Sequence, residues 1–376
     1  MIKRMKVFSL GLGLIGVALM APQFVGAKAT GPCVNCHTMH NSQDGDTELY
    51  GATPNGALTT GGCIGCHTSP TTSLIVNNIP MVLTTGEPAD VLAGGNFYWV
   101  NTTDSTGHNV VGLKAANQDV ALALTPPGWN ANFNANGQVT LGTWNQQLTC
   151  AGTYGCHGTH ENTAGTVVDD FTAISGAHHA DDSAIDGTTT AKSFRFLYGI
   201  IGKEDPTWEN DAVIGNTLHN TYFGVSRLGT GGDAMPTSGD AIKSINYLCA
   251  ECHGDFHSGA DTAGADTGID AGAAWLRHPT DIDMNALAAG VEYKSYTAYD
   301  PLVPVATNRT TGGVVTVDIS NPFANSGDAI VNCISCHRAH GSIEPDLLRW
   351  DYDTCVSAGG DDTCGCFVCH TTKDDV

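Results

Sequence analysis

The sequence Cys-x-x-Cys-His occurs five times along the 376 residues, and its copies begin at Cys33, Cys63, Cys249, Cys333 and Cys366. This pattern is the attachment signature of a c-type haem. Two thiols at this spacing add to the two vinyl groups of the porphyrin, and the adjoining imidazole binds the iron from one face. Five copies spread along the chain predict a multihaem cytochrome c organised around a stacked chain of haems.

A sixth site is predicted where Cys150 and Cys156 precede His157, with five residues between the two cysteines instead of two. His157 directly follows the second cysteine, and His160 repeats a spacing found at other sites. The alternative is a disulfide beside an ordinary histidine. The predicted covalent haem ligands are Cys33, Cys36, Cys63, Cys66, Cys150, Cys156, Cys249, Cys252, Cys333, Cys336, Cys366 and Cys369.

Two of the fourteen cysteines remain after this assignment, Cys355 and Cys364. Free cysteines in a secreted chain tend to pair, so we predict a disulfide between them. A variant haem attachment that uses Cys364 with Cys369 is the less economical alternative.

Histidines are numerous enough to bind every iron on both faces. Six haems with two axial histidines each need twelve ligands, and the chain has fifteen histidines. The predicted proximal ligands are His37, His67, His157, His253, His337 and His370. The predicted distal ligands are His40, His108, His160, His257, His278 and His340, with His178 and His179 as rivals, and His219 is interpreted as structural.

Four distal candidates lie only three or four residues beyond a proximal histidine: His40, His160, His257 and His340. A histidine that close is tied to the same face of that porphyrin, so it cannot easily reach the opposite face of the same iron. It must therefore serve another haem. One short segment would then hold two haems side by side, which predicts a closely packed chain of haems.

The first residues predict a secretory signal peptide over 1–27. Three basic residues precede an apolar run from Val7 to Met20, and small residues follow at Val25-Gly26-Ala27. The run is too short to span a bilayer, although a membrane anchor is the alternative. Removing this leader takes away Lys3, Arg4 and Lys6 and no acids, so the formal charge of −22 falls to −25.

The acidic mature chain, residues 28–376, is predicted to form a single hexahaem domain outside the cytoplasm. No basic patch is available for phosphates, so nucleic acid is excluded as a partner, and no later stretch predicts a transmembrane segment. With 46 glycines and little periodicity, the fold should be irregular, mostly loop, with few short helices and minimal strand. We expect helices at Ile242 to Cys252 and Asp328 to Arg338, and strands near Gly137 to Gly142 and Gly313 to Ile319.

Several of these segments together resemble the OmcS family, secreted hexahaem cytochromes of metal-reducing bacteria that polymerise into conductive filaments. They are Cys-Val-Asn-Cys-His-Thr-Met-His-Asn-Ser at 33–42, Gly-His-Asn-Val-Val at 107–111, Cys-Ala-Glu-Cys-His at 249–253 followed by His257, Leu-Arg-His-Pro at 276–279 and Cys-Ile-Ser-Cys-His-Arg-Ala-His at 333–340. The resemblance implies six bis-histidine irons, a mostly loop fold, and haems stacked in alternating parallel and T-shaped pairs.

The resemblance also implies that His40 ligates the haem attached at Cys333 and Cys336 of a neighbouring subunit. Two features depart from the family pattern, the expanded site at Cys150 and the loop from Cys355 to Cys364. Either can alter subunit packing without altering the chain of haems.

Bis-histidine ligation leaves no open iron position for substrate, which favours electron transfer over enzymatic chemistry. We therefore expect a non-enzymatic, extracellular or outer-surface electron conductor, a homopolymer that delivers electrons to metal oxides or partner cells. A periplasmic or surface carrier with the same six haems c and no polymer is the first alternative. A multihaem reductase is the second; some reductases carry lysine in place of the proximal histidine, and no Cys-x-x-Cys-Lys occurs here.

Overall fold

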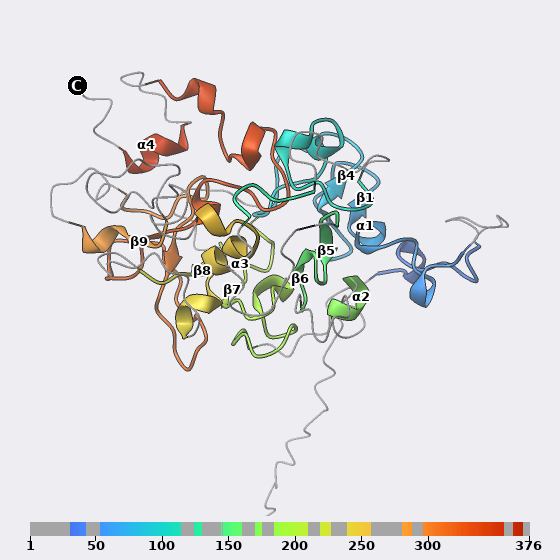
Figure 1. The fold of residues 1–376 in the computed structure, drawn as a ribbon, viewed down its shortest axis with the longest axis horizontal. Helices are drawn as coiled ribbons and strands as arrows, with labels where there is room; N and C mark the ends of the chain where they lie inside the picture. The colour runs from blue at the N-terminus through green and yellow to red at the C-terminus, as the bar shows by residue number, and fades with distance from the viewer. Residues whose placement is uncertain are drawn as a thin grey trace, which may run out of the picture.

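Short regular elements joined by long irregular loops make up the described part of this computed structural model (Figure 1). The fold predicted from the sequence, irregular with few short helices and minimal strand, is confirmed. The residues described are 31–42, 53–113, 124–129, 144, 146–159, 170–174, 184–209, 219–226, 239–256, 280–287, 296–356 and 364–370.

The longest helix in these ranges has eight residues. The α-helices are α1 Cys63–Cys66, α2 Asp170–Ala173, α3 Ile245–Cys252 and α4 Gly365–Cys369. The 3-10 helices are η1 Cys33–Asn35, η2 Gly56–Leu58, η3 Trp99–Asn101, η4 Asp104–Thr106, η7 Phe194–Phe196, η8 Asp240–Lys243, η9 Gly254–Phe256, η10 Met284–Ala286, η12 Cys333–Ser335, η13 Pro345–Leu347 and η14 Tyr352–Thr354. None of the helices in the described ranges has the length and apolar character needed to cross a bilayer.

The strands are no longer than three residues. They are β1 Thr68–Ser69, β2 Ile75–Val76, β3 Ile79–Pro80, β4 Leu83–Thr84, β5 Thr149–Ala151, β6 Gly155–His157, β7 Gly202–Lys203, β8 Thr221–Phe223, β9 Ile282–Asp283, β10 Ala306–Thr307 and β11 Ile330–Val331. Three two-stranded pairs form, β1 with β4 and β5 with β6 in parallel, and β2 with β3 antiparallel.

One five-stranded sheet, in the order β7-β8-β10-β11-β9, organises the C-terminal half. Strands β8 and β10 are parallel and the other neighbours antiparallel. Its central residues Ala306 and Ile330 face each other in register and are fully buried. Because β11 runs directly into the attachment motif at Cys333, the sheet fixes the position of that haem site.

The expected helix at Ile242 to Cys252 is present as η8 followed by α3. The expected helix at Asp328 to Arg338 was wrong. Its first half forms strand β11, which pairs with β9 and β10. This pairing gives hydrogen-bond partners to backbone N–H and C=O groups of these strands. Only η12 is helical, at the attachment motif itself.

The strand expected over Gly313 to Ile319 was also wrong. Thr311 and Val314 form a single bridge across a tight turn, and the residues after it run without a strand partner among the described residues. Burial of Val315 and Ile319 explains the apolar pattern that suggested a strand. The strand expected at Gly137 to Gly142, like the leader over 1–27, lies outside the described residues.

A glycine contact joins the segment around residue 95 to the segment after the Cys-x-x-Cys-His motif at Cys333. Gly95 has φ +87°, and a β-carbon placed on it would overlap the carbonyl oxygen of Gly341. The backbone amide of Asn96 donates to that same carbonyl at 3.0 Å. Only glycine allows this approach, because a side chain would meet both the positive φ and the overlap.

We expect Gly95→Ala to destabilise the protein more than Gly199→Ala. Gly199 has almost the same φ, +84°, with no atom near its missing β-carbon, so its substitution carries only the positive-φ cost of about 1–2 kcal/mol. Denaturant unfolding of the haem-loaded protein, followed by Soret circular dichroism, compares the two variants. Equal losses in both would show that the Gly95–Gly341 contact is not restrictive.

Candidate haem sites

Each of the five regular attachment motifs folds as a single helical turn. The backbone amide of the histidine donates to the carbonyl of the first cysteine at 2.8–3.1 Å in all five motifs. Helices α1, α3 and α4 carry three of them, and η1 and η12 carry the other two. The turn brings both thiols and the imidazole to one side, which the attachment chemistry requires.

The expanded motif uses a different local structure. Strands β5 and β6 lie side by side, Cys150 on the first and Cys156 on the second, and a tight loop joins them. A β-carbon on Gly155 would lie 2.5 Å from the Ala151 backbone, and Gly152 has φ +87°. The two glycines therefore allow five intervening residues to fold back and bring the two cysteines together.

Five of the six predicted proximal histidines donate from Nδ1 to a backbone carbonyl. Donation to a carbonyl fixes the proton on Nδ1 and leaves the Nε2 lone pair available for a metal. The pairs are His37 with Ala57 at 3.0 Å, His67 with Pro80 at 2.8 Å, His157 with Arg195 at 2.9 Å, His253 with Pro127 at 2.7 Å and His337 with Asp346 at 2.7 Å.

Three of these carbonyls belong to the same unusual turn, a 3-10 turn with two successive residues in the left-handed region. The turn residues are Ala57 and Leu58, Arg195 and Phe196, and Asp346 and Leu347, all with φ between 49° and 61°. The first residue accepts from the imidazole, and the second accepts from the backbone amide of the residue after the histidine. Left-handed backbone costs about 1–2 kcal/mol per residue, so these turns are held by the contacts they make.

Two pairs of imidazoles face each other at the separation expected for ligands of one iron. A metal–imidazole bond of about 2.0 Å on each side, plus about 1 Å from nitrogen to ring centre, separates the ring centres by about 6 Å. The His108 and His253 rings are 6.1 Å apart, and the His157 and His340 rings are 6.2 Å apart. The described residues therefore fit bis-histidine haem at the third and fourth sites.

Burial keeps these imidazoles in the neutral form that binds a metal. Burial, followed by the neighbouring imidazoles His157 and His108, lowers the pKa of His340 to about 3. The pKa of His253 falls to about 4, mainly through burial and then through His108. Neutral imidazole is the ligand form of histidine, so no proton needs to leave these rings before iron binds.

The two distal histidines sit on adjacent backbone segments. His108 donates from its backbone amide to the His340 carbonyl at 3.0 Å and from Nδ1 to the Ala339 carbonyl at 2.6 Å. Although they are neighbours, His108 faces the fourth site and His340 faces the third. These hydrogen bonds place the imidazole pairs of the third and fourth sites side by side.

The cysteines of successive sites also lie next to each other. The Cys63 and Cys150 thiols and the Asp170 carboxylate lie within 4.8 Å of one another. Burial, with the neighbouring Cys36 thiol, raises the pKa of Cys66 to about 12.

The same order continues into the C-terminal half. A hydrogen bond with Cys333, with burial, raises the pKa of Cys249 well above its usual range. Burial, with Cys366 nearby, raises the pKa of Cys336 to about 12. Burial and then Cys156 raise the pKa of Cys252, which connects the third and fourth sites. The sites therefore follow one another in space in the order of the sequence, as α1, β5 and β6, α3 and α4 do from right to left in Figure 1.

Asn246 on α3 joins the fourth and fifth sites directly. Its side-chain oxygen accepts from the Cys333 backbone amide at 2.7 Å, and its side-chain nitrogen donates to Asp281 at 2.6 Å. The residue is fully buried. The helix that carries Cys249 and Cys252 is thereby held against the turn that carries Cys333.

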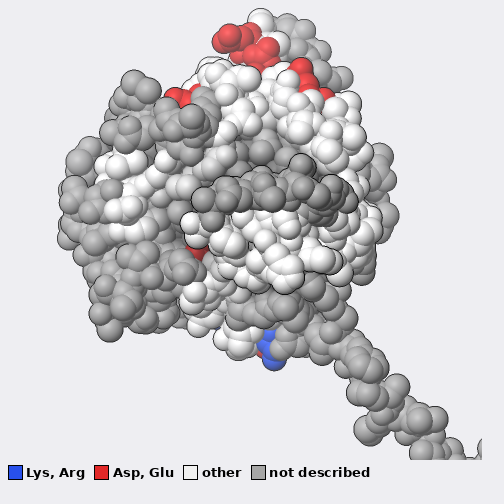
Figure 2. All heavy atoms as spheres, turned by 90° about the vertical axis from the view of Figure 1, so that its right-hand side faces the viewer, with Lys and Arg blue, Asp and Glu red and all other residues white. Residues whose placement is uncertain are grey.

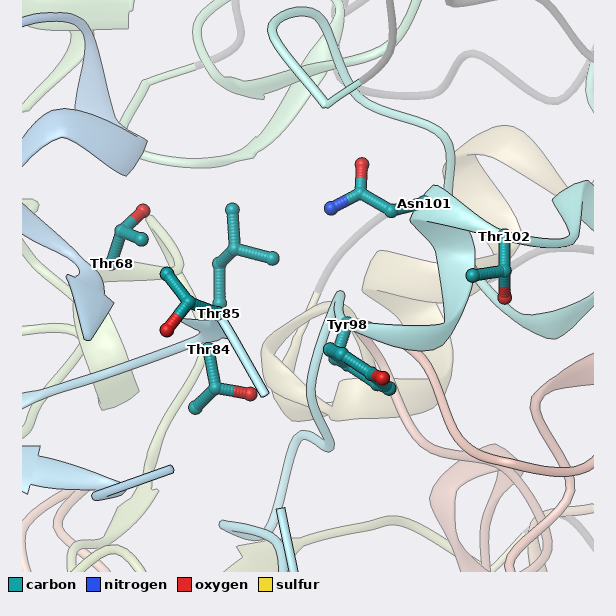
Figure 3. A pocket seen from close by; sticks show the side chains of 7 residues that line it. Thr68, Thr84, Thr85, Tyr98, Asn101 and Thr102 are labelled. Atoms are coloured by element: carbon teal, nitrogen blue, oxygen red, sulfur yellow. The ribbon is translucent and has the colours of Figure 1, made fainter. Parts of the chain in front are cut away.

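Two hollows lie near the second attachment site. One of about 570 Å³ is bordered by Cys63, Cys150, Asp170 and Val111, so it opens between thiols of two successive sites. The other, of about 320 Å³, is lined by Thr68, Thr84, Tyr98 and other uncharged side chains (Figure 3). The second hollow offers no imidazole or thiol, so only the first has groups suited to haem attachment.

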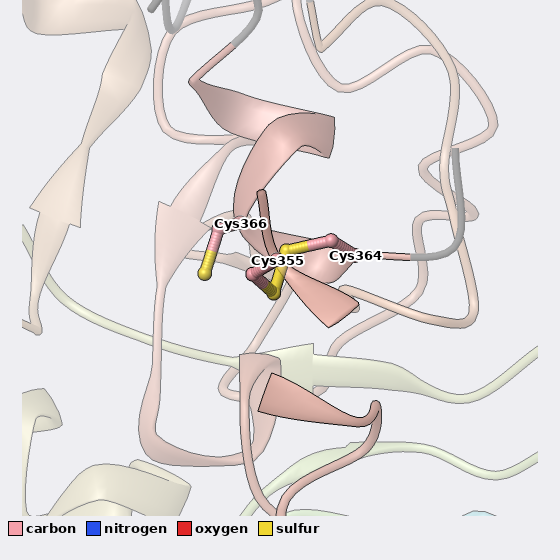
Figure 4. Close-up of side chains that lie close together, drawn as sticks. All are labelled: Cys355, Cys364 and Cys366. Carbon is pink, nitrogen blue, oxygen red and sulfur yellow. A yellow bond between two sulfur atoms is a disulfide. The ribbon is translucent and has the colours of Figure 1, made fainter. Parts of the chain in front are cut away.

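Cys355 and Cys364 are joined by a disulfide, with Cys366 beside them (Figure 4). Because Cys364 is paired, it is not available for the alternative attachment with Cys369. The twelve predicted haem cysteines carry no disulfide.

The structure leaves several predicted ligands unplaced. His160, His178, His179, His257 and His278 lie outside the described residues. His40 is described, exposed, with φ 58°. His219 is buried and stacks on Tyr299 at 3.6 Å, which agrees with a structural residue.

The left-handed turns and Asn246 are functional features that were not predicted from the sequence. The three turns read Gly-Ala-Leu, Phe-Arg-Phe and Pro-Asp-Leu, and they lie 20, 38 and 9 residues from their histidines. Neither composition nor spacing is shared, apart from a large apolar residue at the third position. That residue alone is too common to identify the turn.

Comparison with known proteins identifies similar chains. A family model described as a doubled CXXCH motif matches residues 322–375, which contain the last two motifs. The chain is 24% identical over 419 aligned residues to C-type cytochrome OmcS of Geobacter sulfurreducens, covering 96% of this chain and 90% of that protein. This similarity confirms the resemblance predicted from the motifs.

Two solved structures are also similar. The outer membrane cytochrome S filament from Geobacter sulfurreducens has a TM-score of 0.42 at 21% identity, covering 87% of this chain and 85% of that one. The cryo-EM structure of OmcS nanowires from the same organism has a TM-score of 0.41 at 20% identity, covering 93% of both chains.

We expect His108→Ala to convert one iron from low-spin to high-spin, because the fourth site loses the ligand opposite His253. The number of covalently bound haems should not change, since the thiols are untouched. His219→Gln is the control and should leave all irons low-spin. Electron paramagnetic resonance gives the spin states, and an unaltered low-spin spectrum of His108→Ala would contradict the pairing.

The expanded site can be tested by mass. The secreted protein should carry six covalent haems, and Cys150→Ala with Cys156→Ala should lower its intact mass by one haem apart from the substitutions. Cys355→Ala with Cys364→Ala should leave the haem count at six. A wild-type protein with five haems would show that Cys150 and Cys156 do not attach one.

Proposed function

Because the chain is an OmcS-like multihaem c-type cytochrome, we propose that it conducts electrons out of the cell through six bis-histidine haems c in a homopolymeric filament. The main support is the order of the attachment sites. Thiols of successive sites neighbour one another from Cys36 to Cys369, without a break that would separate one redox centre from the next.

Each bound haem supplies a reversible one-electron change at its iron. The chain's own residues determine how this change is used. Paired imidazoles such as His108 with His253 would hold the iron from both faces and leave it no place for a substrate. This ligation supports an electron-transfer protein and disfavours the reductase alternative.

The remaining distal ligands complete the proposed set. His160, His257 and His278, with His178 and His179 as rivals, would serve irons whose second ligand is not yet paired. In this arrangement the mature residues 28–376 form one domain around the haems, with residues 1–27 as a signal peptide removed on secretion.

His40 supports the polymer. Its side chain is exposed on the N-terminal segment, and it has no ring contact among the described residues. Its neighbour Met39 is 73% exposed, and Val34 is 52% exposed. An exposed histidine on a segment with exposed apolar side chains fits a contact with a second copy of this chain, where His40 would ligate the haem attached at Cys333 and Cys336.

The surface on this side of the molecule is suited to such a contact. Figure 2 faces the side on which the N-terminal segment lies in Figure 1, and few charged side chains appear among its described atoms. A chain with a net charge of −22 would otherwise repel its copies. The sparse charge among the described atoms of this face fits a contact between subunits.

The proposed location is extracellular or at the outer cell surface, with the periplasm as the alternative. Metal oxides or partner cells are the proposed acceptors, and conduction to them does not need a specific binding pocket. A carrier that does not polymerise is the alternative function. In that case His40 must find an iron within its own chain.

We expect His40→Ala to prevent or shorten filaments while the haem count stays at six. The lost ligand should leave one iron high-spin, and added imidazole should restore its low-spin signal without restoring filaments. Negative-stain electron microscopy and electron paramagnetic resonance give the two readouts. Met39→Ala is the matched control, because it removes apolar contact area and keeps the ligand.

Two outcomes would contradict the ligand role of His40. Filaments of normal length with every iron low-spin in His40→Ala would show that His40 binds no iron. Equal loss of filaments in His40→Ala and Met39→Ala, with low-spin irons in both, would assign the segment to packing alone. Dispersed wild-type monomers with all irons ligated would contradict the polymer itself.

A further inference from the structure

Arg349 holds the fifth attachment turn from inside the protein. Its Nε donates to the Ile334 carbonyl at 2.6 Å and to the His337 carbonyl at 3.2 Å, and its backbone amide donates to the Cys336 carbonyl at 2.9 Å. Only 9% of the residue is exposed. A guanidinium is therefore buried against the backbone that carries both the thiol and the proximal imidazole of one haem.

The rest of the guanidinium also meets neutral groups. Its terminal nitrogens donate to the Pro301 carbonyl at 3.1 Å and the Ala93 carbonyl at 3.3 Å. Arg338, which follows the proximal histidine, donates to the Leu92 and Ala93 carbonyls at 3.2 and 3.4 Å. Both arginines thus donate to the Ala93 carbonyl, and every hydrogen bond described for their side chains is to a backbone carbonyl oxygen.

Other arginines in the described residues are neutralised by a carboxylate. Arg195, at the third site, pairs with Glu204 at 3.6 Å, and Arg309 pairs with Asp328 at 2.6 Å. Within the described ranges no carboxylate lies at ion-pair distance from Arg338 or Arg349. Among the residues that the structure describes, the fifth site therefore has two guanidiniums without a direct counter-ion.

Glu209 is the buried acid whose charge acts on this region. It accepts from the Tyr222 hydroxyl at 3.1 Å and the Tyr299 hydroxyl at 3.0 Å, and its charge favours the protonated form of Arg338. Asp90, Asp300 and Asp346 are the other acids whose charges act on this region, and among the described residues none of these carboxylates lies at ion-pair distance from Arg338 or Arg349. The two guanidinium charges are therefore offset only from a distance. Charges in a poorly solvated interior are screened less than at the surface, which extends their effect to a nearby redox centre.

A positive charge favours the state of a neighbouring group that carries more negative charge. Arg349 lies directly against the proximal ligand, since its Nε donates to the His337 carbonyl at 3.2 Å. Reduction of a haem adds one electron, so the same charge stabilises the reduced form.

We propose that Arg349, assisted by Arg338, raises the reduction potential of the haem attached at Cys333 and Cys336 above the value its ligands alone would give. The fifth haem would then hold an electron longer than its neighbours. Arg349 would act through its charge and not by binding the iron, and the inference does not depend on polymerisation.

Substitution can separate the charge of Arg349 from its hydrogen bonds. Arg349→Met removes both, whereas Arg349→Lys keeps the charge and loses the guanidinium fork. Spectroelectrochemical titration of the full haem-loaded protein should show one component, about one sixth of the absorbance change, moving to lower potential in Arg349→Met. A tenfold change in its reduced-to-oxidised ratio corresponds to about 59 mV for one electron. Arg349→Lys should retain most of the wild-type value.

Controls keep the result interpretable. Lys203→Met removes an exposed positive charge paired with Asp318 and should leave all six components in place. Intact mass checks that six haems remain attached. If Arg349→Met loses a haem or fails to fold, Arg338→Met provides the second test, and it should lower the same component.

The proposal is overturned by either of two results. Equal shifts in Arg349→Met and Arg349→Lys would show that Arg349 acts only by holding the turn. Unchanged potentials in Arg349→Met and Arg338→Met, with all haems bound and low-spin, would show that the charge does not reach the haem.

Discussion

The pairing of two imidazoles across a space that fits one metal is the constraint on which this fold depends. Ring centres 6.1 and 6.2 Å apart match the separation of two ligands of one metal, so an iron bound between each pair would join segments distant in sequence. His108 faces a histidine 145 positions further along the chain, and His340 faces one 183 positions earlier. Links of this length would add to the buried apolar clusters of the described residues, such as the one that contains Tyr299, Val305 and Ile319.

Regular secondary structure is sparse because its main task here is to position the cysteines and histidines of the haem sites. Three short α-helices, two 3-10 helices and one glycine loop carry the predicted haem thiols, and backbone carbonyls accept from the imidazoles. The left-handed backbone at Ala57, Arg195 and Asp346 has an unfavourable conformational energy, and it directs a carbonyl toward a histidine. Covalent haem adds apolar surface and cross-links to a chain whose glycine content would otherwise oppose compact folding. Holding the haems and folding the chain are thus one process.

The sequence predicts what is local and chemical. Cysteine spacing identifies the attachment sites, the histidine count allows two ligands for each iron, and leftover cysteines predict the Cys355–Cys364 pair. Glycine content predicts the irregular fold, and the motif order predicts the similarity to OmcS. All of these depend on residues within a few positions of one another or on simple counts.

Long-range features could not be predicted in this way. Residues 328–338 look helical by pattern, yet Ile330 pairs with Ala306, 24 positions away, and with Asp283, 47 positions away, and no local feature indicates such pairing. The spacing of His340 shows that it must serve another haem, but only the fold identifies the site of His157. Arg349 gives no sequence signal at all, because its partners are carbonyls, which every residue possesses.

The most direct test of this account is an electron cryomicroscopy map of the haem-loaded protein isolated gently from the cell surface. We predict six haems in the order of the sequence, with His108 and His253 on the fourth iron and His157 and His340 on the third. A map in which the haems follow another order, or in which those imidazole pairs bind separate irons, would contradict it.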